Sequence, residues 1–414
     1  MIDKNIILSN NELSKDVTYK NAKNNPIQNW FPYLEGFAEN FIDSIFKSTN
    51  REVKFVYEPF SGTGTVPFYC KKNNINVYYS EVNPFLISLT NMKVELLQLE
   101  DSDLEQLNID LSYLINNIEQ LIENQKENTV LKDTYLDTFK KSIYFNESNF
   151  SNILKFKNLI DSYKNNLLSQ ILNISVCYSL LACSNLKRSG DIRFRKGKEL
   201  DQIQEIIPTV YEKLITISKD IINLKKEFSI NKSFVANNNN SKEFIPDIEN
   251  KIDLIVTSPP YLNGTNYIRN TKLELWFCGA LKKQSDLNYF RKEVVTSGIN
   301  DVTKNEKYIE IPRLEKILND KGLWYDQRIP KMIRDYFYDM NIVIENFSKY
   351  LKNDGYVFLD IGDSIYANNH IPTDEILIDI FKAHNFNIID NVLLRERRSK
   401  SGQIVKQTLI IAKK

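Results

Sequence analysis

A strand, a glycine-rich turn, a helix and a second strand follow one another early in the chain, and this succession constrains the fold more than any other feature. The stretch VKFVYEPFSGTGTVPFYCKKNNINVYYSE begins at residue 53. Its hydrophobic pattern predicts strands at 53–57 and 76–81, with a turn at 60–64 and a helix at 65–73 between them. Because a strand–helix–strand connection within one sheet is right-handed, the two strands should lie parallel. The pattern therefore predicts an α/β fold built on a parallel sheet.

The remaining segments extend this unit into one α/β core with two insertions. Strand-like runs return at 233–236 and 253–256, and the end of the chain predicts a strand, a helix and two closing strands at 355–363, 374–386, 387–396 and 407–414. Leucine and isoleucine at helical spacing predict that the first insertion is mostly helical. The predicted division is a polar lead-in (1–22), a first core part (23–92), a helical insertion (93–230), a second core part (231–279), a second insertion (280–350) and a C-terminal core part (351–414).

Charge, histidine and cysteine content narrow the chemistry. The 414 residues carry a formal net charge of +1, so a surface that binds nucleic acid must be local. No run approaches the ~20 apolar residues that span a membrane, and the N-terminus lacks the layout of a signal peptide. Two histidines leave little material for a zinc site or for histidine acid–base catalysis. The cysteines have no paired spacing, which favours a reduced, cytoplasmic setting: Cys70, Cys177, Cys183 and Cys278.

The glycine-rich turn is a candidate nucleoside site. Gly62 and Gly64 allow a sharp turn and a close approach of the backbone to a ligand. No Gly-Lys-Ser/Thr follows, so the turn is not a phosphate-binding P-loop. Glu81 ends the next strand about 20 residues on, where Rossmann-type folds place an acid that binds ribose hydroxyls. The alternatives are a structural turn and a solvated acid at a strand end.

A second candidate is the stretch TSPPY, at the end of the apolar run KIDLIV. Neither Pro259 nor Pro260 can donate a backbone hydrogen bond, so the strand cannot continue through them. The simplest explanation is a rigid turn. The alternative is a binding site, because the same turn fixes a hydroxyl, two carbonyl groups and an aromatic ring in one place.

Taken together, EPFSGTGT, YSEVNP and TSPPY resemble the motifs of the S-adenosylmethionine-dependent amino-methyltransferases of DNA. The stretch from Asn25 to Tyr33 and the closing strands are also similar to elements of that family. The resemblance covers the core and says little about the two insertions. It implies a Rossmann-like class I methyltransferase fold, with a mostly parallel seven-stranded sheet and helical insertions. It also implies S-adenosyl-L-methionine as the cofactor.

The resemblance implies a set of cofactor-binding residues. In the family, the FxGxG turn binds the methionine part of the cofactor and the acid after the second strand binds its ribose. The family usually has an acid after the third strand that meets the adenine amino group, whereas this chain reads VANNNNSKEF, so Asn237 or Asn238 must serve there. The implied residues are Trp30, Tyr33, Glu58, Pro59, Phe60, Ser61, Gly62, Thr63, Gly64, Thr65, Glu81, Val82, Asn83, Asn237 and Ser258.

The resemblance also implies that Ser258, Pro259, Pro260 and Tyr261 form the catalytic tetrapeptide that holds the target base. An exocyclic amino nitrogen is a poor nucleophile because its lone pair is delocalised into the ring. The Ser258 hydroxyl and the Pro259 carbonyl can accept its hydrogens, while the two prolines fix their positions. Tyr261 can stack on a base that has been flipped out of the duplex.

The function that these motifs imply is methylation of DNA at the N4 amino group of cytosine in a specific sequence, in a bacterial restriction–modification system. Ser258 favours cytosine, because adenine enzymes more often carry Asp or Asn there, and N6-adenine methylation is the alternative. No cysteine follows a proline, which argues against carbon-5 cytosine methylation. Further alternatives are an RNA amino-methyltransferase and a non-catalytic nucleic-acid-binding protein. The implied partners are double-stranded DNA and a separately encoded restriction endonuclease, with no membrane.

Contacts with DNA are predicted in the basic segment 184–200 and after the tetrapeptide. Aromatic Phe194 lies within the segment, and such a cluster can neutralise phosphates, although a solvated charged face is the more common explanation. The second insertion is the candidate for recognising the target sequence, with help from 184–200. A lesser candidate is the cluster RERRSK, which begins at Arg395. The predicted DNA-binding residues are Lys187, Arg188, Arg193, Arg195, Lys196, Lys198, Tyr267 and Arg269.

Overall fold

The structure is a computed structural model of the chain. Most of the predicted lead-in lies outside the residues that it describes, and so does Tyr33. The described residues are 2, 25–32, 36–164, 166–189, 191–224, 233–238, 240–262, 265–304, 306–319, 324–399 and 402–414.

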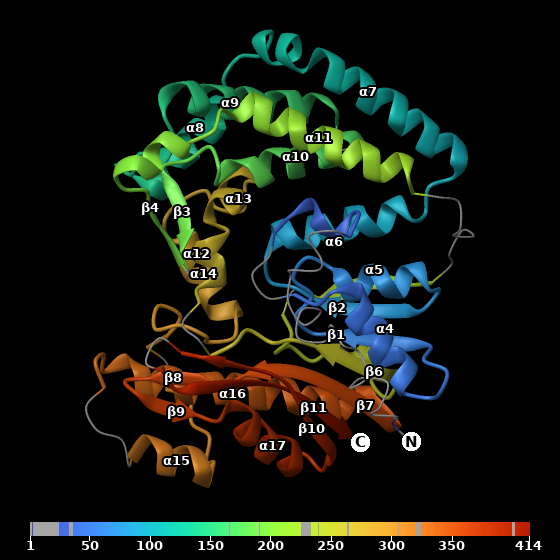
Figure 1. The fold of residues 1–414 in the computed structure, drawn as a ribbon, viewed down its shortest axis with the longest axis vertical. Coiled ribbons are helices and arrows are strands. Elements are labelled where there is room, and N and C mark those ends of the chain that lie inside the picture. The colour runs from blue at the N-terminus through green and yellow to red at the C-terminus, as the bar shows by residue number, and fades with distance from the viewer. Residues whose placement is uncertain are drawn as a thin grey trace.

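A seven-stranded sheet forms the centre of the molecule (Figure 1). Five neighbouring strands run parallel, and β11 is antiparallel to both of its neighbours. This mostly parallel sheet, interrupted by helical segments, confirms the predicted fold class. In spatial order the strands are β10 (Asn387–Arg398), β11 (Ile404–Lys413), β7 (Leu351–Gly362), β6 (Ile252–Thr257), β1 (Phe55–Glu58), β2 (Asn76–Ser80) and β5 (Val235–Asn238).

The predicted strand–turn–helix–strand unit is present as β1, α5 (Thr65–Lys72) and β2. Its two strands are paired in parallel, with Tyr57 opposite Tyr78. β1 occupies the interior of the sheet, where apolar side chains are needed on both faces, and Val56 and Tyr57 are both fully buried. The strand begins and ends one to two residues later than predicted, so Glu58 is its last residue.

Helices cover both faces of the sheet. Val56 and Leu254 point into one core with α4 (Glu39–Ser48) and α5. The next residues along these strands, Tyr57 and Ile255, point into the opposite core with α16 (Arg328–Tyr350) and α17 (Thr373–Ala383). This alternation follows from the two-residue period of a strand, and it fixes which face each strand presents to which helices.

Helix α16 corrects the predicted extent of the second insertion. The sequence division placed residues up to 350 outside the core. In the structure, Ile333, Phe337 and Ile344 of α16 are fully buried and belong to the core beneath β1 and β6. Their spacing of four and seven residues places them on one apolar stripe of the helix, and the sheet covers that stripe. The residues between the tetrapeptide and α16 form α12 (Tyr267–Asn270), α13 (Lys272–Phe277), α14 (Asp286–Glu293) and α15 (Pro312–Asn319).

The first insertion is a helical layer at one end of the molecule, opposite the end formed by the C-terminal strands (Figure 1). Its helices share a single apolar core with Trp276 of α13, so the insertion and the segment after the tetrapeptide are packed together. Between α10 and α11 the basic segment folds as the hairpin β3 (Leu186–Ser189) and β4 (Asp191–Phe194). The helices of the insertion are α7 (Asp101–Glu123), α8 (Thr129–Phe139), α9 (Glu147–Ser162), α10 (Leu167–Leu180) and α11 (Ile206–Ile222), and α6 (Pro84–Leu96) leads into them from the first core part.

Short elements complete the described chain. The hairpin β8 (Ser364–Tyr366) and β9 (Asn369–Ile371) follows β7, and three 3-10 helices lie at Gln28–Trp30 (η1), Gly197–Gln202 (η2) and Pro246–Ile248 (η3). No helix among the described residues is long and apolar enough to cross a bilayer.

Candidate functional site

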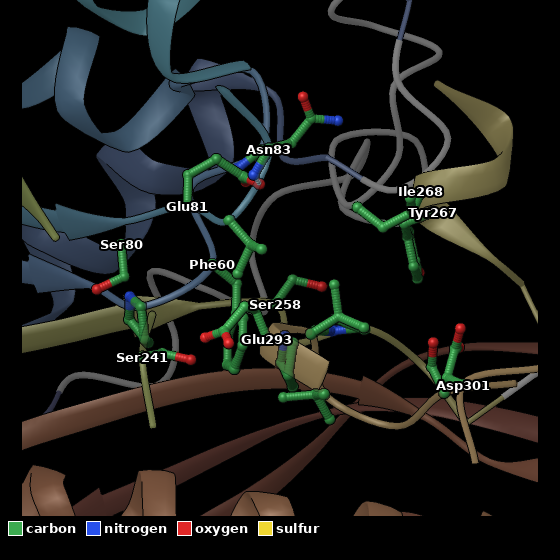
Figure 2. Close-up of a pocket in the computed structure, with 18 residues that line it drawn as sticks. Phe60, Ser80, Glu81, Asn83, Ser241, Ser258, Tyr267, Ile268, Glu293 and Asp301 are labelled. Carbon is green, nitrogen blue, oxygen red and sulfur yellow. Dashed lines mark hydrogen bonds between the residues drawn. The ribbon is translucent and has the colours of Figure 1, made fainter. Parts of the chain in front are cut away.

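The predicted cofactor turn and the predicted tetrapeptide leave the sheet side by side. β1 and β6 are parallel neighbours, with Tyr57 opposite Ile255, so residues 59–64 and 258–261 emerge at the same edge. In open α/β sheets, ligands bind at this carboxyl edge of the strands. A cavity lies there (Figure 2), lined by Pro59, Phe60, Gly62, Ser80, Glu81, Val82, Asn83, Ser241, Ser258, Pro259, Pro260, Tyr267, Ile268, Glu293, Val294, Val295, Ser297 and Asp301.

The glycine-rich turn adopts a conformation that its glycines allow. Gly62 and Gly64 have φ values of 54° and 82°, in the left-handed region. A Cβ atom at Gly64 would lie 2.4 Å from Thr90 Oγ1 in α6, so only glycine fits there without displacing that helix. Within the turn, Ser61 Oγ is buried and has no hydrogen-bond partner among the described residues.

Glu81 faces the cavity as a preorganised acceptor (Figure 2). Its two carboxylate oxygens accept hydrogen bonds from the backbone N–H groups of Gly62, at 2.9 Å, and Asn83, at 2.8 Å. Burial raises the pKa of the Glu81 carboxyl to about 7, while these backbone donors oppose the shift. An acceptor fixed beside a glycine turn matches the hydroxyl donors of a ribose. The residues present therefore fit the nucleoside part of S-adenosylmethionine.

Glu58 joins the two halves of the site. Its side chain is 2% exposed, and one oxygen, Oε1, accepts hydrogen bonds from the Phe60 N–H (3.0 Å) and the Thr257 hydroxyl (2.6 Å). Burial raises the pKa of the Glu58 carboxyl to about 8. Phe60 belongs to the cofactor turn and Thr257 precedes the tetrapeptide, so Glu58 fixes one relative to the other. It does this from behind the cavity, since it is not among the lining residues.

The tetrapeptide is divided between the cavity wall and the core. Ser258, Pro259 and Pro260 line the cavity, whereas the Tyr261 ring is 6% exposed and is not among the lining residues. The Tyr261 hydroxyl donates to Asp360 Oδ2 at 2.9 Å and accepts from Gln407 Nε2 at 2.8 Å. The predicted stacking of Tyr261 on a base stays a prediction, and what the structure adds is an anchor for its hydroxyl.

Asp360 follows the sequence prediction that it ends a strand near the site, with a structural role at least as probable as a functional one, whereas Gln407 had no predicted role. Gln407 Nε2 also lies 2.8 Å from both carboxylate oxygens of Asp360, and its Oε1 accepts from Arg395 Nε at 2.6 Å. Both side chains are almost fully buried. The available signal was weak: a glutamine within the apolar closing strand QTLIIAKK.

Several of the predicted cofactor residues do not face this cavity. Trp30 is buried in the core of the first insertion and donates from Nε1 to Asp220 at 2.8 Å. The Thr63 carbonyl accepts a hydrogen bond from Lys93 Nζ at 2.9 Å, and burial lowers the pKa of this lysine to about 7. Asn237 is paired with Tyr79 within the sheet and lines none of the described cavities.

A second cavity adjoins the first and shares Val82 and Glu293 with it. The sequence had predicted none of the residues that the second insertion contributes here. The second cavity is lined by Val82, Pro84, Ile87, Asn238, Asn240, Glu243, Ala280, Asp286, Tyr289, Phe290 and Glu293.

The second insertion also supplies an acid to the first cavity. Asp301 is buried, accepts from Asn266 Nδ2 at 2.9 Å, and lies across the cavity from Glu81 (Figure 2). Burial raises the pKa of Asp301 to about 6. Together with Tyr267 of α12, it closes the side of the cavity that is farthest from the cofactor turn.

The predicted DNA-binding cations are partly engaged within the protein. Glu199 accepts from both terminal nitrogens of Arg193, at 2.7 and 2.9 Å, and from Lys187 at 3.2 Å, and these bonds hold the pKa of Glu199 well below its usual range. Arg195 Nε donates to two backbone carbonyls, and Arg269 pairs with Asp191 at 2.8 Å.

Lys196 and Lys198 remain exposed, whereas Lys187, Arg188 and Arg195 line a third cavity, with Lys213. The structure therefore gathers most of the predicted cations around one hairpin. Tyr267 belongs to the wall of the first cavity.

The described residues contain no group of three or more His, Cys, Asp and Glu side chains that could hold a metal ion. No family model matches the chain. A solved S-adenosylmethionine-dependent methyltransferase from Methanosarcina mazei aligns over 88% of this chain and 93% of its own length, at 8% identity and a TM-score of 0.30.

Curated relatives match along most of the chain. The type II methyltransferase M.AvaI of Nostoc sp. is 27% identical over 427 residues, covering 94% of this chain and 85% of the relative. M.BsoBI of Geobacillus stearothermophilus is 23% identical, covering 94% and 84%, and M.MvaI of Kocuria varians is 21% identical, covering 84% and 78%. Both are also type II methyltransferases. The chain is therefore a distant homologue of type II methyltransferases.

Proposed function

We propose that this protein is a type II DNA methyltransferase of a restriction–modification system, and that it methylates the N4 amino group of cytosine in a specific sequence. The observation that carries the proposal is the pairing of two sites at adjacent strand ends. Gly62 and Glu81 on one side and Ser258 to Pro260 on the other line a single cavity. The homology to type II methyltransferases supports the same reaction.

The cofactor half of the site would hold S-adenosylmethionine, which supplies an electrophilic methyl group when bound. Glu81 would accept hydrogen bonds from the ribose hydroxyls. The turn from Pro59 to Gly64 would lie against the methionine part, with the polar N-terminus of α5 beside it. Burial keeps the site partly shielded from water, and this strengthens each hydrogen bond made there.

The acceptor half would act on the amino group of a flipped base. Ser258 Oγ and the Pro259 carbonyl would accept the two amino hydrogens and so favour the pyramidal nitrogen that attacks the methyl group. Held by these two acceptors, the amino nitrogen would take up the methyl group that the bound cofactor supplies, and it would then lose one proton to water. No strong general base is required, which suits a chain with two histidines.

The choice of cytosine rests on the serine at the first tetrapeptide position. N6-adenine methylation is the second candidate, because the same acceptors can bind either amino group. Single-molecule sequencing of DNA from cells that express the protein identifies base and recognition sequence together. We expect N4-methylcytosine at one short motif. N6-methyladenine at that motif would show that adenine, not cytosine, is the target base. Unmodified DNA from cells with folded protein would refute both candidates.

A further inference from the structure

The second cavity has the chemistry of a site for a heterocycle, because apolar side chains and a few polar ones line it together. Its apolar walls come from two different segments: Val82 and Ile87 follow the ribose-binding Glu81, and Phe290 belongs to α14 in the second insertion. It adjoins the first cavity, because Val82 and Glu293 line both. A nucleoside whose ribose is bound at Glu81 could therefore place its base between these walls.

Polar side chains at the rim of this cavity are the groups that could recognise the edge of the base. The strand that ends there, β5, supplies amides rather than acids. Asn238 Nδ2 donates to the Asn240 carbonyl at 3.0 Å. Asn240 is 6% exposed, its Nδ2 donates to Glu293 Oε2 at 2.6 Å, and its Oδ1 accepts from the Lys242 N–H at 3.0 Å. Both polar atoms of the Asn240 side chain are thus engaged within the protein.

Glu293 differs from the other acids of this cavity. The Asp286 carboxylate accepts from the backbone N–H groups of Lys282 and Lys283, and Glu243 is exposed. Glu293 is half-buried and lies where the two cavities meet, held by Asn240 through one oxygen. The structure records no partner for its other oxygen, Oε1, among the described residues. Figure 2 shows Glu293 in the wall of the cavity that Glu81 also lines.

We propose that Glu293, supplied by the second insertion, accepts a hydrogen bond from the amino group on the purine of the cofactor, with Asn240 as its positioning residue. An ionised carboxylate has acceptors only, so it suits a donor such as an exocyclic amino group. The inference rests on the proposed function, because it assumes an adenosyl cofactor at Glu81. It gives α14 a role in cofactor selection and replaces Asn237 and Asn238 in the predicted contact.

The test compares two ligands by isothermal titration calorimetry: S-adenosylhomocysteine and its analogue with hydrogen in place of the 6-amino group. The wild-type protein should bind the amino ligand about tenfold more tightly or better, because a hydrogen bond to a charged group contributes at least that much. In Glu293→Gln, Asn240 still needs an acceptor, so the glutamine carbonyl should face it. The glutamine NH₂ then meets the ligand amino group, donor against donor, and the preference should fall to about twofold or less.

Glu243→Gln is the matched control, since it makes the same change at an exposed acid of the same cavity and should keep the wild-type preference. Equal binding of the two ligands by the wild type, or an unchanged preference in Glu293→Gln, would overturn the role of Glu293 and leave the proposed function intact. Binding of neither ligand by folded wild-type protein would instead refute the proposed function. If Glu293→Gln does not fold by circular dichroism, Asn240→Ala takes its place: a reduced preference supports the proposal and an unchanged one overturns it.

Discussion

At the scale of single residues, the Tyr261 side chain of the proposed tetrapeptide is held by hydrogen bonds within the core. Its hydroxyl lies between Asp360 and Gln407, and all three side chains are almost fully buried. Ser258 Oγ lies 3.5 Å from the same hydroxyl, at the outer limit of a hydrogen bond. The anchor therefore fixes the end of the tetrapeptide directly, and it acts on Ser258 mainly through the rigid prolines between them.

Removing the Tyr261 hydroxyl should cost stability and turnover together. Tyr261→Phe leaves Asp360 and Gln407 with buried polar groups lacking one partner, which costs about 1–3 kcal/mol of unfolding free energy. Turnover should fall because the tetrapeptide loosens, while the Kd for S-adenosylhomocysteine stays near the wild-type value. Denaturant unfolding, single-turnover methylation and calorimetry measure the three quantities.

Tyr366→Phe is the matched control for this change. Tyr366 is also buried, but its hydroxyl has no hydrogen-bond partner among the described residues. Its removal should change the unfolding free energy by less than about 1 kcal/mol, because no buried partner is left unsatisfied. Equal effects of the two substitutions would show that the anchor contributes nothing specific.

Glu58 should make stability depend on pH. Burial raises its pKa to about 8 from an ordinary value of 4.5, so between these values the folded protein holds a proton that the unfolded chain releases. Unfolding free energy should therefore decrease as pH rises from about 5 to 8. Glu81, with a pKa raised to about 7, contributes in the same direction.

Glu58→Gln keeps the acceptor for Phe60 and Thr257 but cannot ionise, so its unfolding free energy should decrease less steeply with pH than that of the wild type. Urea titrations at several pH values measure it, with Glu119→Gln, an exposed site on α7, as the control. A slope in Glu58→Gln that equals the wild-type slope would contradict the assignment of a protonated Glu58.

At the scale of elements, the cofactor turn depends on how closely α6 approaches it. Gly64 has a φ of 82°, and a Cβ there would collide with Thr90. Gly402 has a similar φ of 84°, but a Cβ atom added there would have no atom within 4 Å. A substitution at Gly402 therefore introduces the backbone strain without a steric clash. The two glycines therefore form a natural pair of test sites.

Gly64→Ala should destabilise the protein by about 1–3 kcal/mol more than Gly402→Ala, because overpacking adds to the same backbone strain. It should also weaken binding of S-adenosylhomocysteine, which Gly402→Ala should leave unchanged. Thermal unfolding and calorimetry test both statements. Equal destabilisation by the two variants would mean that α6 yields to the added methyl group.

The basic hairpin of the first insertion gives a second prediction at this scale. Lys196 and Lys198 are exposed, whereas Arg193 and Lys187 are engaged by Glu199. If the hairpin contacts phosphates, replacing both exposed lysines with alanine should reduce the slope of log K for DNA binding against log salt concentration by about two, because two fewer counterions are released on binding.

Lys54→Ala with Lys251→Ala is the control pair, because these exposed lysines lie just before β1 and β6, at the opposite edge of the sheet. Gel-shift titrations over a range of salt concentrations measure the slope. Identical slopes for wild type and the hairpin variant would exclude these two lysines from the interface.

At the scale of the whole molecule, local patterns made the core predictable and left the long-range contacts hidden. The unit from β1 to β2 and the tetrapeptide after β6 are each encoded in a short, continuous stretch, and parallel pairing follows from their connection. The Tyr261–Gln407 contact joins residues 146 positions apart, and neither local sequence indicates which residue the other contacts. Only the packed sheet brings the closing strand beside the tetrapeptide.

The insertions were harder still to predict. Amphipathic spacing identifies a helix but not the surface that it covers, which is why α16 seemed part of an insertion while it packs beneath the sheet. Glu293 of α14 lines the same cavity as Glu81 and accepts a hydrogen bond from Asn240, and a lone acid at the end of a short helix gives no signal of this in the sequence. These residues became candidates only once the fold placed them at one edge of the sheet.

The central claim is that the two adjacent strand ends hold a methyl donor and a cytosine amino group in one site. It is tested most directly by incubating purified protein with unmethylated DNA and S-adenosylmethionine carrying a deuterated methyl group, then digesting the DNA to nucleosides for mass spectrometry. We predict deuterated N4-methylcytosine, reduced in Gly64→Ala, which weakens cofactor binding, and strongly reduced in Tyr261→Ala. Label found in 5-methylcytosine, or no label in DNA that contains the mapped recognition sequence, would contradict the account.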